Sequence, residues 1–142
     1  MKIQITKIIR PIKLEEYATE LKGQTVDVWV NPTRNVINTF DNLNQRMALE
    51  MDKVRRVLPG DGEDRTNYQK SLDHLATWTD EEYAPKLREW YAALWSQGEN
   101  QERHWTPEEL KELDETDPAL FNWLRDMSQE KMREHRNRQK KS

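Results

Sequence analysis

The chain opens with two stretches whose apolar positions recur every second residue, which is the period of a β-strand. The first covers residues 1–9, with Ile3 and Ile5 on one side, and Pro11 is expected to end it. The second covers residues 24–30, where three valines share one face. Because two strands alone bury too little apolar surface, the pattern predicts a two-stranded ribbon that is covered by helices.

The segment between these strands has the spacing of a short helix over residues 14–21, and Gly23 stands where such a helix would end. On the second strand the valines face one way and Trp29 faces the other. If the valines face the core, Trp29 lies on the outer face. We therefore expect Trp29 to be exposed and accessible to a partner.

Residues 33–58 predict one long helix with a narrow apolar stripe. The spacing of three and four is closer to the seam of a coiled coil than to the broad face of a globular helix. The polar stretch that follows, rich in glycine and proline at its start, predicts a flexible loop over residues 59–67 and then a short helix. The stripe consists of Val36, Phe40, Leu43, Met47, Met51, Val54 and Leu58.

A similar five-residue phrase occurs twice, starting at Trp78 and at Trp105, and each copy has the pattern of a helix N-terminus. Thr79 and Thr106 are the predicted N-caps. In both copies a glutamate three residues after the threonine completes a capping box, and the tryptophan is placed to form a hydrophobic staple with the residue at N4. These glutamates are Glu82 and Glu109, and the N4 residues are Tyr83 and Leu110.

Apolar residues at helical spacing follow each of these starts. Tryptophans in such stripes usually form a core, although one or two of them could instead line a groove for a partner helix. Asp117 and Pro118 mark a further helix start, with aspartate at the N-cap and proline at N1. The stripes are Leu87, Trp90, Tyr91, Leu94 and Trp95, and then Leu120, Trp123, Leu124 and Met127.

Together these elements predict a mainly α fold with a small N-terminal β-ribbon (α+β), arranged as a small helical bundle. One domain is expected over residues 1–128, followed by a basic, disordered tail over residues 129–142. Of the 142 residues, 35% are hydrophobic and 35% are charged, whereas soluble domains average about 25% charged residues. The core is therefore thin, and binding of a partner can supply part of the stability.

The chemistry of the side chains gives no sign of an enzyme, a cofactor or a metal. There is no cysteine, and the three histidines lack the spacing of a helical metal pair. The net charge of −3 does not suggest a nucleic-acid-binding protein, although the basic tail could contact phosphates. No apolar run is long enough to span a membrane and no cleavable signal follows the N-terminus, so we expect a cytoplasmic protein.

Several phrases resemble the small tail assembly chaperones of long-tailed bacteriophages. They are Leu14-Glu15-Glu16-Tyr17-Ala18, Val28-Trp29-Val30-Asn31-Pro32, Leu94-Trp95-Ser96-Gln97-Gly98, Trp105-Thr106, and Asp117-Pro118-Ala119-Leu120 with Trp123-Leu124. The resemblance implies a non-enzymatic helper in the bacterial host cytoplasm. Such a helper binds the helical tape measure protein, keeps it soluble, and leaves as tail tube subunits polymerise. Many of these chaperones also have a longer form made by ribosomal slippage, and Lys140-Lys141 could be encoded by the adenine run that slippage requires.

On this interpretation the candidate partner-binding residues are Trp29, Val36, Phe40, Leu43, Met47, Met51, Val54 and Trp95. The pattern does not decide whether the seam over residues 36–58 packs within the chain or against a second copy, so a homo-oligomer stays open. Two other functions remain as alternatives. One is a minor structural or head–tail joining protein of the virion, and the other is a small DNA-binding regulator that uses the basic tail.

Overall fold

A computed structural model describes residues 3–57 and 62–141 of the chain. The predicted fold class is confirmed, because the protein is mainly α-helical with a two-stranded antiparallel ribbon near the N-terminus. Where the sequence predicted one domain, the chain forms two compact units. The first unit consists of Met1–Thr33 and Arg88–Ser142, and the second consists of Arg34–Leu87.

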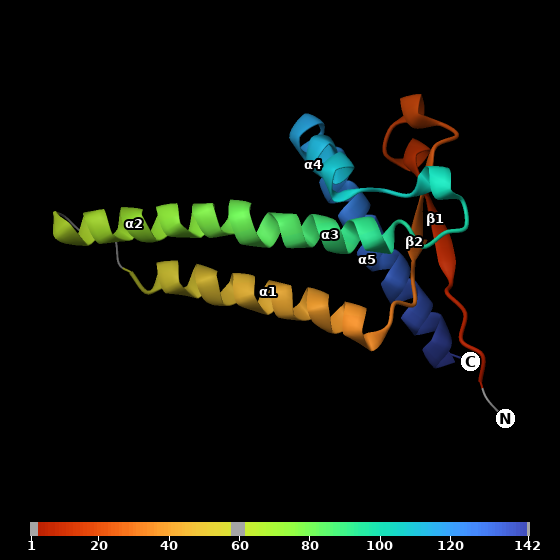
Figure 1. Cartoon of the computed structure of the whole chain (residues 1–142), viewed down its shortest axis with the longest axis horizontal. Helices are drawn as coiled ribbons and strands as arrows, with labels where there is room; N and C mark the ends of the chain where they lie inside the picture. The colour runs from red at the N-terminus through yellow and green to blue at the C-terminus, as the bar shows by residue number, and fades with distance from the viewer. Residues whose placement is uncertain (1–2, 58–61, 142) are drawn as a thin grey trace. The chain divides into compact units, whose positions relative to one another are not determined.

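The elements follow one another in a simple order along the chain (Figure 1). The strands are β1 (Ile9–Lys13) and β2 (Thr25–Trp29). The helices are α1 (Arg34–Arg55), α2 (Glu63–Trp78), α3 (Ala84–Leu94), α4 (Pro107–Thr116) and α5 (Pro118–Lys141). A π-helical turn, η3 (Thr79–Tyr83), connects α2 with α3, and three short 3-10 turns are η1 (Leu14–Glu16), η2 (Thr19–Leu21) and η4 (Gln101–Arg103).

Strand β1 lies later in the chain than predicted, and it contains Pro11 instead of ending there. The Val30 N–H donates to the Ile8 carbonyl, which makes these two residues a hydrogen-bonded pair of the antiparallel ladder. In such a ladder the hydrogen-bonded pairs alternate with non-bonded pairs, so Pro11, three residues on, has its nitrogen turned to the free edge. Its missing N–H therefore costs no ladder bond, and the expectation that proline ends the strand was wrong.

The predicted helix over residues 14–21 is also replaced by a different local structure, the two 3-10 turns η1 and η2. A segment this short gains little from α-helical hydrogen bonds, so its conformation follows the connection that it must make. Gly23 has a positive φ of 87°, so its role as the residue that ends the turn in a left-handed conformation is confirmed. It leads directly into β2.

The core of the first unit forms where the ribbon packs against α5. Val26, Val28 and Val30 are all buried, as the alternation predicted for one face of the second strand. Apolar side chains from the end of α3 and from α4 and α5 complete this core, among them Leu94, Trp95, Leu110, Phe121 and Leu124. The apolar stripe predicted on α3 is entirely buried.

Trp95 is the centre of this core and has no exposed surface. Its ring lies 5.2 Å from Tyr91, 6.3 Å from Trp105 and 6.1 Å from Phe121, measured between ring centroids. Its indole N–H donates to the Ser128 hydroxyl at 2.8 Å, and that hydroxyl donates to the Leu124 carbonyl at 2.7 Å. A buried tryptophan therefore has its one polar atom satisfied by α5.

Helix α5 continues through the segment that the sequence predicted as a disordered tail. Ser128 and Met132 are both buried on one face of this helix, so the packing extends beyond the predicted domain boundary. Similarly, α2 begins at Glu63, so residues 63–67 are helical and not part of the predicted flexible loop. Residues 59–61 of that loop lie outside the described residues.

The two predicted capping boxes have different outcomes. At Thr106 the capping box is confirmed, because its hydroxyl accepts from the Glu109 N–H and the Glu109 carboxylate accepts from the Thr106 N–H. The Asp117 cap of α5 is confirmed as well, with its carboxylate accepting from the Leu120 N–H at 3.1 Å. Thr79, however, is not an N-cap, since helical backbone precedes it and its hydroxyl donates to the Leu75 carbonyl at 2.7 Å.

Replacing Ser128 by alanine removes the hydroxyl that accepts from the Trp95 indole N–H. We expect Ser128→Ala to lower the free energy of unfolding by about 1–3 kcal/mol, the typical cost of a buried donor without a partner. Urea denaturation followed by circular dichroism measures this change. Ser71→Ala is a matched control, because Ser71 makes the same kind of bond to the carbonyl four residues earlier on α2 but is less buried. Equal losses in the two variants would contradict the role given to Ser128.

The two threonines of the repeated phrase provide a second test. Thr106→Ala is expected to lower the free energy of unfolding by about 1 kcal/mol, because it removes a capping hydroxyl. Thr79→Ala is expected to change the free energy of unfolding by less than about 0.5 kcal/mol, because alanine has a high helix propensity. Thermal and urea unfolding of both variants measure the difference. A loss at Thr79 as large as the loss at Thr106 would show that a helix starts there after all.

Candidate partner-binding surface

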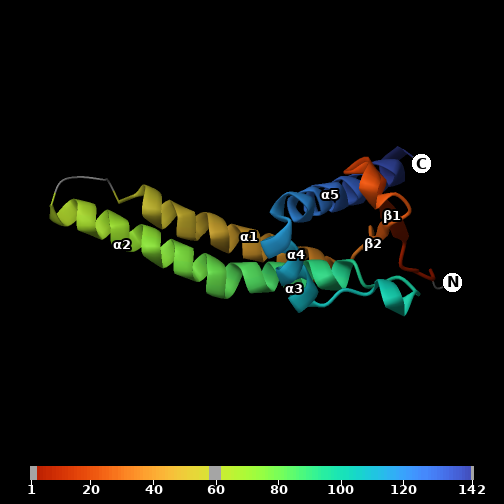
Figure 2. The same cartoon turned by 90° about the horizontal axis from the view of Figure 1, so that it is seen from above.

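The second unit is an antiparallel helical hairpin in which α1 and α2 lie side by side (Figures 1 and 2). The long helix predicted over residues 33–58 is confirmed as α1, which ends at Arg55, three residues earlier than expected. Its apolar stripe is the feature that the sequence singled out for partner binding. This α1 stripe consists of Val36, Phe40, Leu43, Met47, Met51 and Val54, and Leu58 of the predicted stripe lies outside the described residues.

Most of the α1 stripe is only partly covered. Val36, Phe40, Leu43 and Met47 are half-buried, and Met51 is 39% exposed. Val54 is buried, and the other buried apolar side chains among the described residues of this unit are Trp78 and Leu87. Two helices packed as a pair cannot enclose a stripe of this length, so the hairpin retains apolar surface along it.

A buried carboxylate interrupts the stripe. Glu50 lies between Met47 and Val54 at helical spacing, and only 8% of its surface is exposed. Its Oε1 atom accepts from Lys53 Nζ at 3.0 Å, and its Oε2 atom lies 3.9 Å from His74 Nε2 of α2. Sequence reasoning missed this residue because the stripe was traced through apolar residues alone. Position 50 lies three residues after Met47 and four before Val54, so the spacing of the stripe itself would have identified Glu50.

Glu50 also lines a cavity of about 240 Å³ between the two helices. The lining is mixed, with cationic groups beside the carboxylate and two apolar side chains. It consists of Glu50, Lys53, Val54, Lys70, Ser71, His74 and Leu75. Because this space is partly polar, α1 and α2 do not interlock tightly at this level, and the hairpin is held more weakly here than a continuous apolar seam would hold it.

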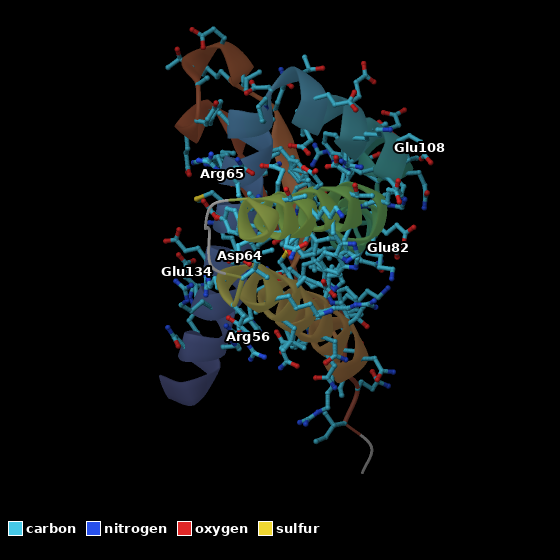
Figure 3. The ribbon with its side chains drawn as sticks, turned by 90° about the vertical axis from the view of Figure 1, so that its left-hand side faces the viewer. Arg56, Asp64, Arg65, Glu82, Glu108 and Glu134 are labelled. Atoms are coloured by element: carbon cyan, nitrogen blue, oxygen red, sulfur yellow. The ribbon has the colours of Figure 1, made fainter. Side chains whose placement is uncertain are left out.

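The outer side of α1 has a different character. Leu49 is 63% exposed and lies in a shallow groove among Arg46, Lys53 and Arg56. Figure 3 shows Arg56 on the side of α1 that faces away from α2. An isolated exposed leucine among long cationic side chains is common on a protein surface, so this groove is less informative than the stripe.

The π-helical turn η3 fixes the end of the hairpin. Trp78 and Tyr83 would lie about 140° apart on a regular α-helix, but the wider π-turn brings residues five apart onto one side. Their rings lie 6.1 Å apart between centroids. Both side chains also reach α1, where the Tyr83 hydroxyl donates to Asn44 at 2.9 Å and the Arg46 guanidinium lies 5.7 Å from the Trp78 ring.

Two of the predicted partner-binding residues belong to the first unit, and both are buried. The expectation that Trp29 is exposed was wrong, since it is only 8% exposed. The connection after α3 covers its face of the ribbon, because Asp27 forms an ion pair with Arg103 at 3.7 Å and lies against Gly98. The Lys7 ammonium lies 5.2 Å from the centroid of the Trp29 ring.

Trp95 is likewise unsuited to contact a partner directly. It is completely buried, as expected for the aromatic core, so its place among the candidate partner-binding residues was wrong. Both tryptophans were candidates because the sequence does not reveal how a loop covers a strand face or how far α5 extends. Of the predicted partner-binding residues, only members of the α1 stripe retain exposed surface.

The hairpin cavity is lined by a serine, a histidine and a glutamate, the residue types of a catalytic triad. The Ser71 hydroxyl donates to the Asn67 carbonyl, and the distance of 3.9 Å between His74 and Glu50 exceeds that of a hydrogen bond. A nucleophile activated by an oriented base needs both links, so this arrangement is not a catalytic triad. Among residues 3–57 and 62–141, no group of three histidine, cysteine or acidic side chains is placed to hold a metal ion.

A search of the described helices for one with the length and apolar character needed to cross a lipid bilayer finds none. In comparisons with known proteins, no family model, no curated protein and no solved structure matches this chain. The α1 stripe and the sequence motifs are thus the observations from which a function can be inferred.

The surroundings of Glu50 lead to opposite expectations for two substitutions. Glu50→Met is expected to raise the free energy of unfolding by about 1 kcal/mol, because it removes a buried charge and leaves only an exposed lysine behind. Lys53→Met is expected to lower it by about 0.5–1 kcal/mol, because the buried carboxylate loses its hydrogen-bond donor. Urea denaturation of both variants tests the pair. A larger loss for Glu50→Met than for Lys53→Met would mean that the carboxylate stabilises the hairpin.

Proposed function

We propose that this protein is a tail assembly chaperone of the kind found in long-tailed bacteriophages, and that its helical hairpin binds an amphipathic helix of the tape measure protein. The observation that carries the proposal is the half-buried α1 stripe. The motifs that resemble this family also support it, and they include the capped helix starts at Thr106 and Asp117. The site of action would be the cytoplasm of the bacterial host.

The hairpin suits a helical partner in both length and pattern. The α1 stripe repeats at the spacing of three and four that matches the seam of another helix. A helix laid along it would complete a three-helix arrangement and remove the remaining apolar surface from water. Each half-buried side chain that becomes covered would contribute about 1 kcal/mol, roughly half the value for complete burial of an apolar residue.

The same surface explains how the partner could be released. The stripe is narrow, it is interrupted by Glu50, and two of its central residues are methionines, whose flexible side chains adapt to different partners. A contact of this kind gives moderate affinity, because much of the gain from burial is offset by the entropy lost in binding. Tail tube subunits that enclose the tape measure protein could then displace the chaperone.

The direct experiment is to co-express this chain with a tape measure protein of a long-tailed bacteriophage and to measure their association after affinity purification. Met47→Asp and Met51→Asp each place a charge on the α1 stripe and are expected to weaken binding by about tenfold or more, which corresponds to about 1.4 kcal/mol. Gln45→Asp introduces the same charge on an exposed position of α1 that lies outside the stripe, and it should bind normally. Circular dichroism confirms that each variant is folded.

Equal binding by the stripe variants and by Gln45→Asp would refute the assignment of the α1 stripe. The wider proposal is tested on purified virions by mass spectrometry. A chaperone should be absent from the finished particle, whereas a minor structural or joining protein should be present in a fixed copy number. Retention on DNA that falls steeply with salt concentration would instead favour a DNA-binding regulator.

A further inference from the structure

The N-terminal arm, residues 3–8, is the other place where apolar side chains are exposed. Ile3 is 87% exposed and Ile5 is 86% exposed, the highest values among the large hydrophobic side chains of the described residues. The arm has no regular secondary structure, although its sequence alternates apolar and polar residues as a strand does. An exposed segment of this type is suited to pair with another strand.

Asn31 holds this arm in line with the ribbon. Its side-chain carbonyl accepts from the Ile8 N–H at 2.7 Å, and its side-chain amide donates to the Thr6 carbonyl at 2.9 Å. The Asn31 side chain thus takes the place of the next residue of β2 and continues the ladder by one further step. The arm is therefore aligned with β1 up to Thr6, which lowers the entropy that would be lost when it pairs with another strand.

The ladder fixes which backbone groups of the arm are available. The even-numbered residues Thr6 and Ile8 direct backbone groups toward β2 and Asn31, so the odd-numbered residues direct theirs to the free edge. In the part of the chain that the structure describes, the backbone of Ile3, Gln4 and Ile5 makes no hydrogen bond. Pro11 closes the same edge further along, because it has no N–H to donate, so the open edge is limited to the arm.

The charge of the arm indicates what kind of strand can pair with it. Residues 3–6 are uncharged, and Lys7 is turned back, with its ammonium above the Trp29 ring and hydrogen-bonded to Gln97. Over residues 3–6 the open edge is therefore uncharged, and it alternates isoleucine with small or amide side chains. A neutral edge with a free ladder matches an identical edge, which is the self-complementary contact that a two-fold dimer requires.

We propose that two copies of this chain associate through their N-terminal arms, which pair as antiparallel strands with Ile5 opposite Ile5 of the second copy. In this register the odd-numbered residues of the two arms face each other, so their free backbone groups lie opposite one another. Ile3 then lies opposite Lys7, and no lysine faces another lysine. The isoleucines of both arms then lie on one face, the face of the ribbon that carries Ile9 and Trp29. This contact is separate from the α1 stripe and does not depend on the function proposed for it.

A cysteine cross-link tests the pairing directly, because the natural sequence contains no cysteine. In Ile5→Cys the two introduced thiols should lie within disulfide range across the strand pair, so mild oxidation of the full-length protein should yield a covalent dimer. Arg10→Cys is the matched control, since it lies on exposed β1 outside the paired segment. We expect about tenfold more disulfide-linked dimer from Ile5→Cys than from Arg10→Cys. Equal yields would overturn the proposal.

Sedimentation equilibrium without oxidation provides an independent measurement. The natural protein should show a concentration-dependent monomer–dimer equilibrium, and Ile5→Lys should weaken dimerisation by about tenfold or more because like charges would face each other across the pair. Ile5 is almost fully exposed in the monomer, so Ile5→Lys should not affect folding, and circular dichroism checks this. A natural protein that stays monomeric at millimolar concentration, or a dimer that Ile5→Lys does not weaken, would overturn the proposal.

Discussion

The hydrogen bond from the Trp95 indole to Ser128 is the interaction on which the first unit depends. Trp95 brings a large apolar surface to the centre of the core, and burying its N–H without an acceptor would cost about 1–3 kcal/mol. Ser128 supplies that acceptor, and it lies beyond the last apolar residue of the predicted stripe on α5. The helix must therefore remain intact to the last residue of the predicted domain, and the burial of Met132 one turn later extends the same packing beyond that boundary.

The second unit has no comparable centre. Its buried polar side chain, Glu50, is charged, and it faces a cavity and not a closed aromatic cluster. Removing a carboxylate from water costs more than one hydrogen bond to an exposed lysine returns, so the α1 stripe is not optimised for the stability of the hairpin alone. The two units thus differ in kind. One has a closed core, and the other has a seam that leaves apolar surface available for a partner.

The elements that sequence reasoning predicted well are those determined by neighbouring residues. Helix α1, the stripe on α3 and the caps at Thr106 and Asp117 depend on residues within a few positions of one another. The failures occurred where distant contacts competed with a local pattern. The phrase at Trp78 has the same capping residues as that at Trp105, yet the helix runs through it, because a π-turn lets Trp78 and Tyr83 both contact α1. Similarly, Trp29 is buried by a loop about seventy residues later in the chain, which alternation within a strand cannot reveal.

At the candidate site, too, the sequence pattern could not reveal contacts between distant residues. Periodicity identified the α1 stripe because a binding seam and a core seam obey one spacing rule, and for that reason it could not decide how much of the stripe is covered. Only the packing of α2 answers that question, and it leaves Met51 substantially exposed while it buries Glu50. A buried charge within a seam favours one alignment of the helices over others, since a shift would move His74 of α2 away from the carboxylate and place other side chains against it. A specific alignment at a cost in stability fits the function that we propose, in which this surface binds one helix and later releases it.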